Sequence, residues 1–188
     1  MSLFLILLAA GDSKRLKSNI PKPFYTVNDK TLLEHSFNAF KNFNEIKRTI
    51  IVYKKKHKKH LNKLRLKNVL KVEGGKTRQE SAFKALKIIM KMNCKKVLIH
   101  DAARPNPSKK LINEIIKKLE KNNAAIPVIK VSDETRKKLS KKKDKIEFFE
   151  FELFALEINS SLQALIIGCK AYLSSIILGL ILYPPFAS

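Results

Sequence analysis

The sequence predicts an α/β fold built on a mostly parallel β-sheet with helices on both faces. Short apolar strands alternate with amphipathic helices as far as about Lys130, which is the pattern of such a sheet. The chain has 188 residues, of which 45% are hydrophobic. This length and composition suffice for one domain with a full hydrophobic core, and they exclude a wholly disordered chain.

The first strand is predicted at the apolar run of residues 3–8, which ends at the small residues Ala9-Ala10-Gly11. A secretory signal peptide is the alternative for such a start, but no basic residue precedes the run and the run is too short to span a bilayer. A helix is expected next, because Thr31-Leu32-Leu33-Glu34 is a capping box. Its apolar stripe consists of Leu33, Phe37, Phe40 and Phe43.

Two further strands are predicted on either side of a very basic stretch. Residues 49–53 form the second strand and residues 68–72 the third, which ends at Gly74-Gly75. The stretch between them, residues 57–67, is expected to be helical, with His57 and His60 as solvated helix residues.

The alternation continues after the third strand. Thr77-Arg78-Gln79-Glu80 is a second capping box, and the strand predicted at residues 96–100 ends in Asp101-Ala102-Ala103-Arg104-Pro105. His100 is expected to be packed or hydrogen-bonded rather than catalytic. A strand at residues 124–129 closes the pattern, and the two intervening helices are buried through Ala82, Ala85, Leu86 and Ile89 and through Leu111, Ile112, Ile115, Ile116 and Leu119.

The chain is strongly basic. Its 39 Lys and Arg residues against 16 Asp and Glu residues give a formal net charge of +23, which favours anionic ligands and would attract nucleic acid or acidic lipid nonspecifically. The lysines are not interleaved with aromatic residues and no recognised nucleic-acid motif occurs, so we expect no specific nucleic-acid partner. Cys94 and Cys169 show neither metal-ligand spacing nor a disulfide framework, which favours a reducing, cytoplasmic compartment.

Three unusual segments follow predicted parallel strands: Ala9-Ala10-Gly11, Gly74-Gly75-Lys76-Thr77-Arg78 and Asp101-Ala102-Ala103-Arg104-Pro105. Ligands collect at the carboxyl ends of the strands in such sheets. Backbone N–H groups beside well-spaced cations are typical of phosphate binding. The sequence therefore predicts one shared site for a nucleoside triphosphate.

Four groups of residues also stand in a specific order and spacing: Ala9-Ala10-Gly11 with Arg15 and Pro21-Lys22; Gly74-Gly75 with Arg78 and Ser81; His100-Asp101-Ala102-Ala103-Arg104-Pro105; and Ala125-Ile126-Pro127-Val128. In this order they resemble the 2-C-methyl-D-erythritol 4-phosphate cytidylyltransferase family over residues 3–145. The resemblance implies a Rossmann-like sheet of the nucleotide-diphospho-sugar transferase type. It also implies a nucleotidyltransferase that condenses CTP with this sugar-alcohol phosphate, releases pyrophosphate and serves the non-mevalonate synthesis of isoprenoid precursors.

The resemblance further implies the roles of individual residues. Arg15 and Lys22 would be catalytic, because they would hold the triphosphate and stabilise charge on its α-phosphoryl group. Asp101 would lie beside the Mg²⁺ ion that accompanies CTP. Thr135 would contact the acceptor substrate, and the family implies a homodimer. The nucleotide-binding set would be Ala9, Ala10, Gly11, Gly75, Lys76, Arg78, Ser81, Asp101 and Ala102.

The sequence departs from the family at three places before residue 145. Ser13 replaces a second glycine that is common in the first loop, and Lys76 replaces an acidic residue. In Asp133-Glu134-Thr135-Arg136, where the family reads Asp-Thr, either Glu134 takes the threonine position or one residue is inserted and Thr135 takes it.

After residue 145 the resemblance stops. Residues 146–188 change from lysine-rich to aromatic and aliphatic, and the later family motifs and the dimer-forming arm are absent or scrambled. Three interpretations stand: a membrane anchor, a divergent core segment, or an out-of-frame translation of the proper gene end. We favour the last, because this tail lacks the caps, alternation and turn signals that the earlier chain obeys.

We therefore predict a nucleotidyltransferase domain at residues 1–145 and an atypical, truncated or aberrant C-terminal part at residues 146–188. The nucleotide half of the site is nearly complete, whereas the acceptor half is not, so weak or absent turnover is expected. Two alternatives to this function remain: a related cytidylyltransferase for another polyol phosphate such as ribitol 5-phosphate, and a non-enzymatic, basic polyanion-binding or tail-anchored protein.

Overall fold

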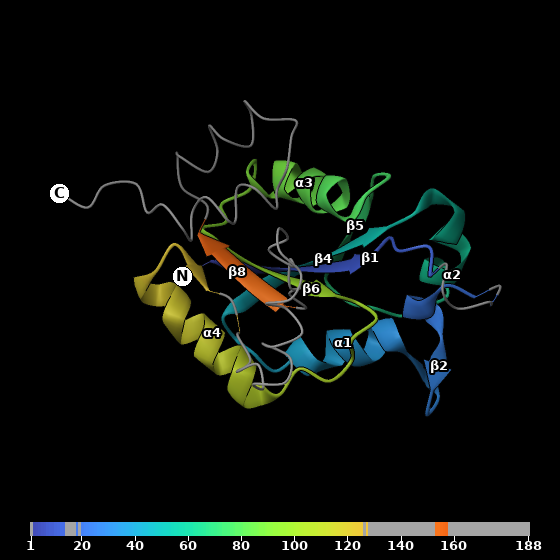
Figure 1. Ribbon diagram of the computed structural model, residues 1–188, viewed down its shortest axis with the longest axis horizontal. Coiled ribbons are helices and arrows are strands. Elements are labelled where there is room, and N and C mark those ends of the chain that lie inside the picture. The colour runs from blue at the N-terminus through green and yellow to red at the C-terminus, as the bar shows by residue number, and fades with distance from the viewer. Residues whose placement is uncertain (1, 14–17, 19, 126, 128–152, 158–188) are drawn as a thin grey trace, which may run out of the picture.

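The computed structural model describes residues 2–13, 18, 20–125, 127 and 153–157, and all structural statements here concern those residues. They build a six-stranded sheet in the order β5-β4-β1-β6-β8-β7 (Figure 1). Its strands are β1 (Leu3–Ala9), β4 (Ile46–Tyr53), β5 (Val69–Glu73), β6 (Lys96–Asp101), β7 (Ala124–Ala125) and β8 (Leu153–Glu157). A separate hairpin pairs β2 (Thr26–Val27) with β3 (Lys30–Thr31).

Four of the strands run parallel and form the centre of the fold. β1 pairs with β4 on one side and β6 on the other, and β4 pairs with β5. Ile6, for example, lies opposite Ile50 of β4 and Ile99 of β6. Because the four strands point the same way, their carboxyl ends meet at one edge of the sheet.

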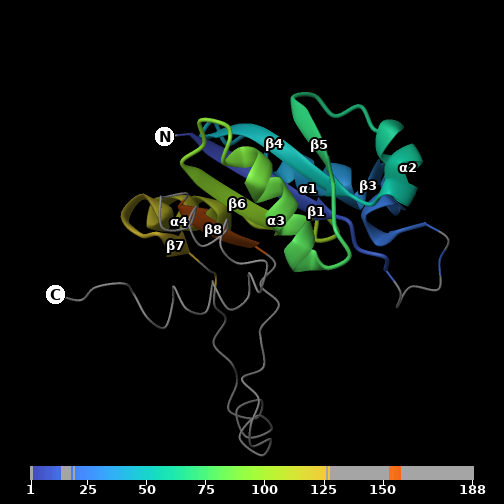
Figure 2. The same cartoon turned by 90° about the horizontal axis from the view of Figure 1, so that it is seen from above.

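Helices cover both faces of this sheet, as predicted. α3 (Arg78–Ile89) lies on one face, and α1 (Leu32–Phe40) and α4 (Lys109–Lys121) lie on the other (Figures 1 and 2). Side chains of β1 alternate between the two layers: Phe4, Ile6 and Leu8 join the α3 layer, whereas Leu3, Leu5 and Leu7 join the α1 and α4 layer. All seven residues of β1 are buried, which explains its unbroken apolar run.

The first predicted capping box is confirmed at the start of α1. The Thr31 hydroxyl accepts the Glu34 backbone N–H at 3.2 Å, and the Glu34 carboxylate accepts the Thr31 N–H at 2.8 Å. The buried Ser36 hydroxyl donates to the Ala102 carbonyl at 2.9 Å. This bond ties α1 to the loop after β6.

The basic stretch after β4 differs from the prediction. It forms a 3-10 helix, η2 (Lys55–His57), and only five residues of α-helix, α2 (Lys58–Asn62). The N-cap residue His57 makes no side-chain capping bond, and cations crowd a helix start where positive charge is unfavourable. His57 is also 5% exposed, so its prediction as a solvated residue is wrong.

The Phe24 ring explains the burial of His57. It lies 6.0 Å from the His57 ring and 5.4 Å from the His60 ring, centroid to centroid. A charged imidazole is disfavoured in such a setting, and burial lowers the pKa of His57. The η2–α2 segment therefore serves as a packing surface for the segment that contains Phe24.

The sheet extends beyond the predicted domain boundary. β8 lies between β6 and β7 and is antiparallel to both, so residues 153–157 of the predicted tail are part of the sheet. In the described portion of the chain, no helix has the length and apolarity needed to cross a membrane. The remainder of the tail, Arg15 and Thr135 lie outside the described residues.

The capping box generates the first testable prediction. Thr31→Ala should lower the free energy of unfolding by about 1 kcal/mol, because the Glu34 N–H loses its partner. Thr26→Ala, at an exposed position of β2, is the control and should change it by less than about 0.5 kcal/mol. Urea denaturation of both variants measures the difference, and equal effects would contradict the capping assignment.

Candidate functional site

A cavity of about 320 Å³ opens at the carboxyl edge of the parallel strands. Three loops form it: residues 10–13 after β1, residues 74–77 after β5 and residues 102–105 after β6. Seven predicted site residues line it, namely Ala10, Gly11, Lys22, Lys76, Arg78, Ser81 and Asp101. The structure thus brings together the segments that the sequence analysis singled out.

The other predicted residues lie elsewhere. Gly75 belongs to the second loop, but it and the fully buried Ala9 do not line the cavity. Ala102 is also fully buried, and its backbone is engaged: the N–H donates to the Leu8 carbonyl at 3.1 Å and the carbonyl accepts from Ser36. Its neighbour Ala103 lines the cavity instead.

The first loop is held by its polar side chains. Ser13 has a φ of 51°, in the left-handed region of backbone conformation. Glycine adopts this conformation more readily than serine does, so serine is an unusual residue at this position. Its hydroxyl accepts the Lys22 backbone N–H at 2.7 Å. Asp12 forms ion pairs with Lys54 and Lys56, and these two contacts lower the pKa of Asp12 to about 2.

Lys22 occupies a rigid turn. It begins the 3-10 helix η1 (Lys22–Phe24), and prolines on both sides restrict the backbone. Phe24, only 4% exposed, anchors this turn against His57. The prediction that two prolines restrain Lys22 beside the site is consistent with this geometry.

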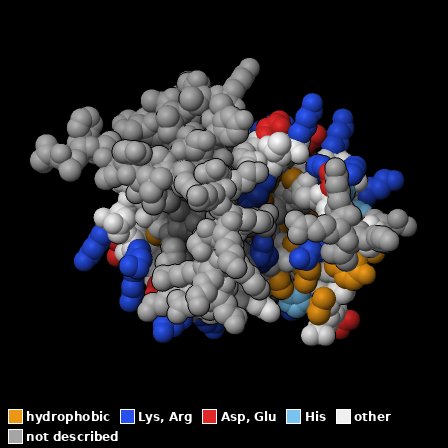
Figure 3. All heavy atoms as spheres, viewed as in Figure 1, with side chains coloured by type: hydrophobic (Ala, Val, Ile, Leu, Met, Phe, Trp, Pro, Cys, Tyr) orange, Lys and Arg blue, Asp and Glu red, His pale blue; other side chains and the backbone are white. Residues whose placement is uncertain are grey.

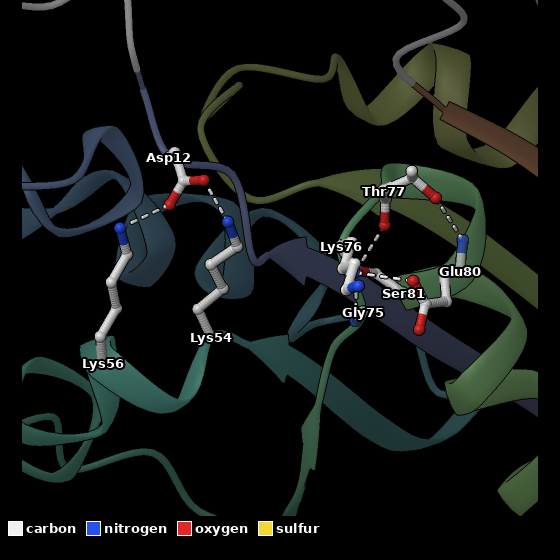
Figure 4. A network of polar contacts seen from close by, with 8 residues as sticks. All are labelled: Asp12, Lys54, Lys56, Gly75, Lys76, Thr77, Glu80 and Ser81. Carbon is white, nitrogen blue, oxygen red and sulfur yellow. Dashed lines mark hydrogen bonds and ion pairs between the residues drawn. The ribbon is translucent and has the colours of Figure 1, made fainter.

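The second loop is held by the start of α3 (Figure 4). The Ser81 hydroxyl accepts the Gly75 N–H at 3.0 Å and donates to the Thr77 carbonyl at 2.8 Å. The Glu80 carboxylate accepts the Lys76 N–H at 2.8 Å, which lowers the pKa of Glu80. The second capping box is therefore only half formed: Thr77 caps the Glu80 N–H at 3.0 Å, but Glu80 turns to Lys76.

Asp101, the last residue of β6, lies between two arginines. Its carboxylate accepts from Arg78 Nε at 3.1 Å and lies 3.6 Å from Arg104 Nε. Just before it, His100 is 1% exposed, and its Nε2 lies 2.7 Å from the Arg104 carbonyl. Its ring packs 5.2 Å from that of Phe40, which agrees with a packed, hydrogen-bonded histidine.

The cavity is positively charged. Five cations line it, Lys22, Lys54, Lys76, Arg78 and Arg104, against the two carboxylates Asp12 and Asp101. Five positive and two negative charges leave an excess of three positive charges in the lining. Each of the two carboxylates forms ion pairs with two cations. Figure 3 shows Lys and Arg side chains at separate places on the viewed face as well, so positive charge is not confined to this cavity.

Two of these charged lining residues, Asp12 and Lys54, were missed in the sequence analysis, and Arg104 was named there only as part of the third segment. Lys54 directly follows the last residue of β4, a fourth parallel strand that ends at the same edge. Its position after a predicted parallel strand could have indicated a site residue, but a lysine among several neighbouring lysines does not stand out in the sequence.

A larger cavity of about 640 Å³ lies away from these loops. It is bounded by α1, the first residues of β4 and the segment before β5, and it contains none of the motif residues. The smaller cavity is therefore the candidate site.

The oxygen ligands that the cavity offers can be compared with those that a magnesium ion needs. In the described part of the chain, no three His, Cys, Asp or Glu side chains are grouped for a protein-only metal site. A magnesium ion bound with a nucleotide needs only one or two carboxylates, because phosphates supply further oxygens. Asp101 and Asp12 both line the cavity, so this number is available.

A parallel sheet with a phosphate-type loop after its first central strand and a cationic cavity at its carboxyl edge is typical of the class of nucleotide-binding α/β proteins. The comparisons with known proteins make this specific. The family model for IspD, 2-C-methyl-D-erythritol 4-phosphate cytidylyltransferase, matches residues 3–144, and the chain belongs to this family.

Relatives of known name agree with the assignment. The chain is 46% identical over 140 residues to a bifunctional enzyme IspD/IspF of Pelagibacter ubique, covering 74% of this chain and 38% of the relative. It is 39% identical over 130 residues to the 2-C-methyl-D-erythritol 4-phosphate cytidylyltransferase of Thermotoga neapolitana, covering 68% and 59%. The chain thus spans less than two thirds of the length of each of these relatives.

Solved structures show the same fold. The bifunctional IspDF from Campylobacter jejuni matches with a TM-score of 0.62 at 30% identity, over 71% of this chain and 34% of that one. The 4-diphosphocytidyl-2C-methyl-D-erythritol synthase from Anaerococcus prevotii matches over 97% of this chain and 82% of that one, with a TM-score of 0.65 at 22% identity. The latter likeness concerns the fold alone.

Gly74 provides a test of the packing beneath the site. An added Cβ would lie 2.7 Å from Ser81 Oγ and 2.9 Å from Ala10 Cβ, whereas one at Gly11 would meet nothing within 4 Å. Gly74→Ala should cost about 1–3 kcal/mol of unfolding free energy, as overpacking does. Gly11→Ala, the matched control, should leave it unchanged within about 1 kcal/mol. Similar denaturation midpoints for the two variants would refute the close approach.

The buried His100 predicts a pH dependence of stability. Burial lowers its pKa in the folded state, so below pH 6.5 the unfolded chain takes up a proton that the folded protein resists. Stability should therefore fall as the pH drops from 7.5 to 5.5, and His57 contributes in the same direction. His100→Gln should make the fall in melting temperature smaller. An identical pH profile in the variant would show that His100 is not responsible.

Proposed function

We propose that this chain carries the CTP-binding part of a cytidylyltransferase that uses 2-C-methyl-D-erythritol 4-phosphate as its acceptor. The observation that carries the proposal is the cationic cavity in which the first loop, Lys22, the second loop and Asp101 meet. Membership of the family supplies the identity of the two substrates. The products would be 4-diphosphocytidyl-2-C-methyl-D-erythritol and pyrophosphate, a step in isoprenoid precursor synthesis.

The reaction needs charge stabilisation more than covalent catalysis. An anionic phosphate oxygen of the acceptor attacks the α-phosphorus of CTP, and the bond from that phosphorus to the oxygen bridging to the β-phosphate breaks. The electron pair leaves with pyrophosphate, so no side chain has to remove a proton. Lys22, whose backbone is held by Ser13 and by its prolines, is proposed to stabilise the charge that develops, and Arg15 is proposed to share this role.

The second loop is proposed to hold the nucleoside. The N–H groups of Gly75 and Lys76 are fixed by Ser81 and Glu80, which keeps the loop closed against α3. A preorganised loop binds at a lower entropic cost than one that must order itself. Thr135 is proposed to contact the acceptor.

Asp101 is the residue we propose to lie beside Mg²⁺, with Asp12 as the second carboxylate within the same cavity. The ion would neutralise charge on the triphosphate and on the departing pyrophosphate. In the protein itself, Arg78 and Arg104 hold the Asp101 carboxylate in position. We also propose the cytoplasm as the compartment and a homodimer as the assembly, as the sequence resemblance implies.

Calorimetry with CTP and Mg²⁺ on the full chain tests the nucleotide half of the site. Lys22→Ala should weaken CTP binding by about 10-fold or more, since a charged hydrogen bond contributes about 1.5–3 kcal/mol. Lys59→Ala, at an exposed position on α2, removes the same charge away from the cavity and serves as the control. Failure of the folded wild-type chain to bind CTP would overturn the proposal.

Pyrophosphate release, with and without 2-C-methyl-D-erythritol 4-phosphate, tests the chemistry. Release should require both substrates and be lost in Lys22→Ala. Release without the acceptor would contradict the proposed transfer.

A further inference from the structure

Asp12 of the first loop is held by two lysines that reach it from the end of β4 (Figure 4). Lys56 Nζ lies 2.8 Å from one carboxylate oxygen, and Lys54 Nζ bonds to the other. Both lysines therefore form an ion pair with the same carboxylate, and Lys54 also donates a hydrogen bond to it.

Their surroundings differ. Lys54 lines the cavity and its side chain is only 23% exposed, whereas Lys56 does not line the cavity and is 65% exposed. An ammonium group has three N–H donors, and among the described residues Asp12 is the single hydrogen-bond partner of Lys54 Nζ. Lys54 thus has donors available on the cavity side.

The position of Asp12 explains why its negative charge has to be neutralised by lysines. A carboxylate directly after Gly11, in the loop that faces the phosphates of a nucleotide, would repel them if it were alone. Its low pKa keeps it ionised at any pH at which the protein works. Two lysines overcompensate the single negative charge, so the cluster of Asp12, Lys54 and Lys56 has a net charge of +1.

We propose that Lys54 is a further polyphosphate-binding residue of this cavity, and that Asp12 holds its ammonium in place until the nucleotide arrives. This inference rests on the proposed function, since the ligand is the polyphosphate of the nucleotide. On binding, phosphate oxygens share or replace Asp12 as partners of Lys54. Lys56 stays with Asp12 and limits its repulsion of the phosphates.

The two lysines provide their own matched control. Lys54→Met and Lys56→Met each remove one positive charge and one ion pair with Asp12, and they differ in whether the lost ammonium faces the cavity. Binding of CTP and of inorganic tripolyphosphate to the full chain is measured by calorimetry. Lys54→Met should weaken both by about 10-fold or more, and Lys56→Met by less than about 3-fold. Lys54→Arg, which keeps the charge, should recover most of the binding of both.

Equal losses in the two methionine variants would overturn the inference, because the lysines would then act only by ordering Asp12. A loss of CTP binding with tripolyphosphate binding intact would also overturn it, since Lys54 would then contact the nucleoside. Circular dichroism confirms that each variant is folded. Tripolyphosphate binding requires neither cytosine nor the acceptor. The proposed transferase activity can therefore be absent while Lys54→Met still weakens tripolyphosphate binding more than Lys56→Met does. Equally, the activity can be present while the two variants bind tripolyphosphate equally well.

Discussion

The parallel pairing of β1 with both β4 and β6 is the constraint on which the rest of the structure depends. It buries every residue of β1 and separates the two helical layers. It also fixes the carboxyl ends of neighbouring strands at one edge, so loops far apart in the sequence become the walls of one cavity. The site is thus a consequence of strand direction, and its individual loops add the chemistry.

Charge in this site is distributed by pairing each carboxylate with two cations. Asp101 lies between Arg78 and Arg104, and Asp12 lies between two lysines. Acidic groups inside an anion site are tolerable only when neutralised, and in this arrangement they also fix the cations that surround them. The chain is rich in lysine, and of the three lysines that line the cavity, Lys54 is held by an ion pair with a carboxylate that lines the same cavity.

The rigidity of the site comes from packing behind it. Phe24 against His57 fixes the turn of Lys22, and Ser36 against Ala102 fixes the third loop to α1. Gly74 leaves room for the close approach of Ala10 to the start of α3. These contacts are apolar or neutral, so they hold the loops without competing for the anionic ligand. This division between a neutral support and a charged surface suits a site that must be preorganised.

The sequence by itself determined the α/β fold, the four parallel strands, the capping box at Thr31 and seven of the residues that line the cavity, because periodicity, caps and motifs are local signals. It did not determine the short α2, the burial of His57 or the half-formed second cap. The burial of His57 depends on Phe24, which reaches it from elsewhere in the fold, whereas the second cap is half formed because Glu80 accepts the neighbouring Lys76 N–H. The ion pair between Lys54 and Asp12 was decided by tertiary structure, since only strand pairing brings the end of β4 beside the loop after β1.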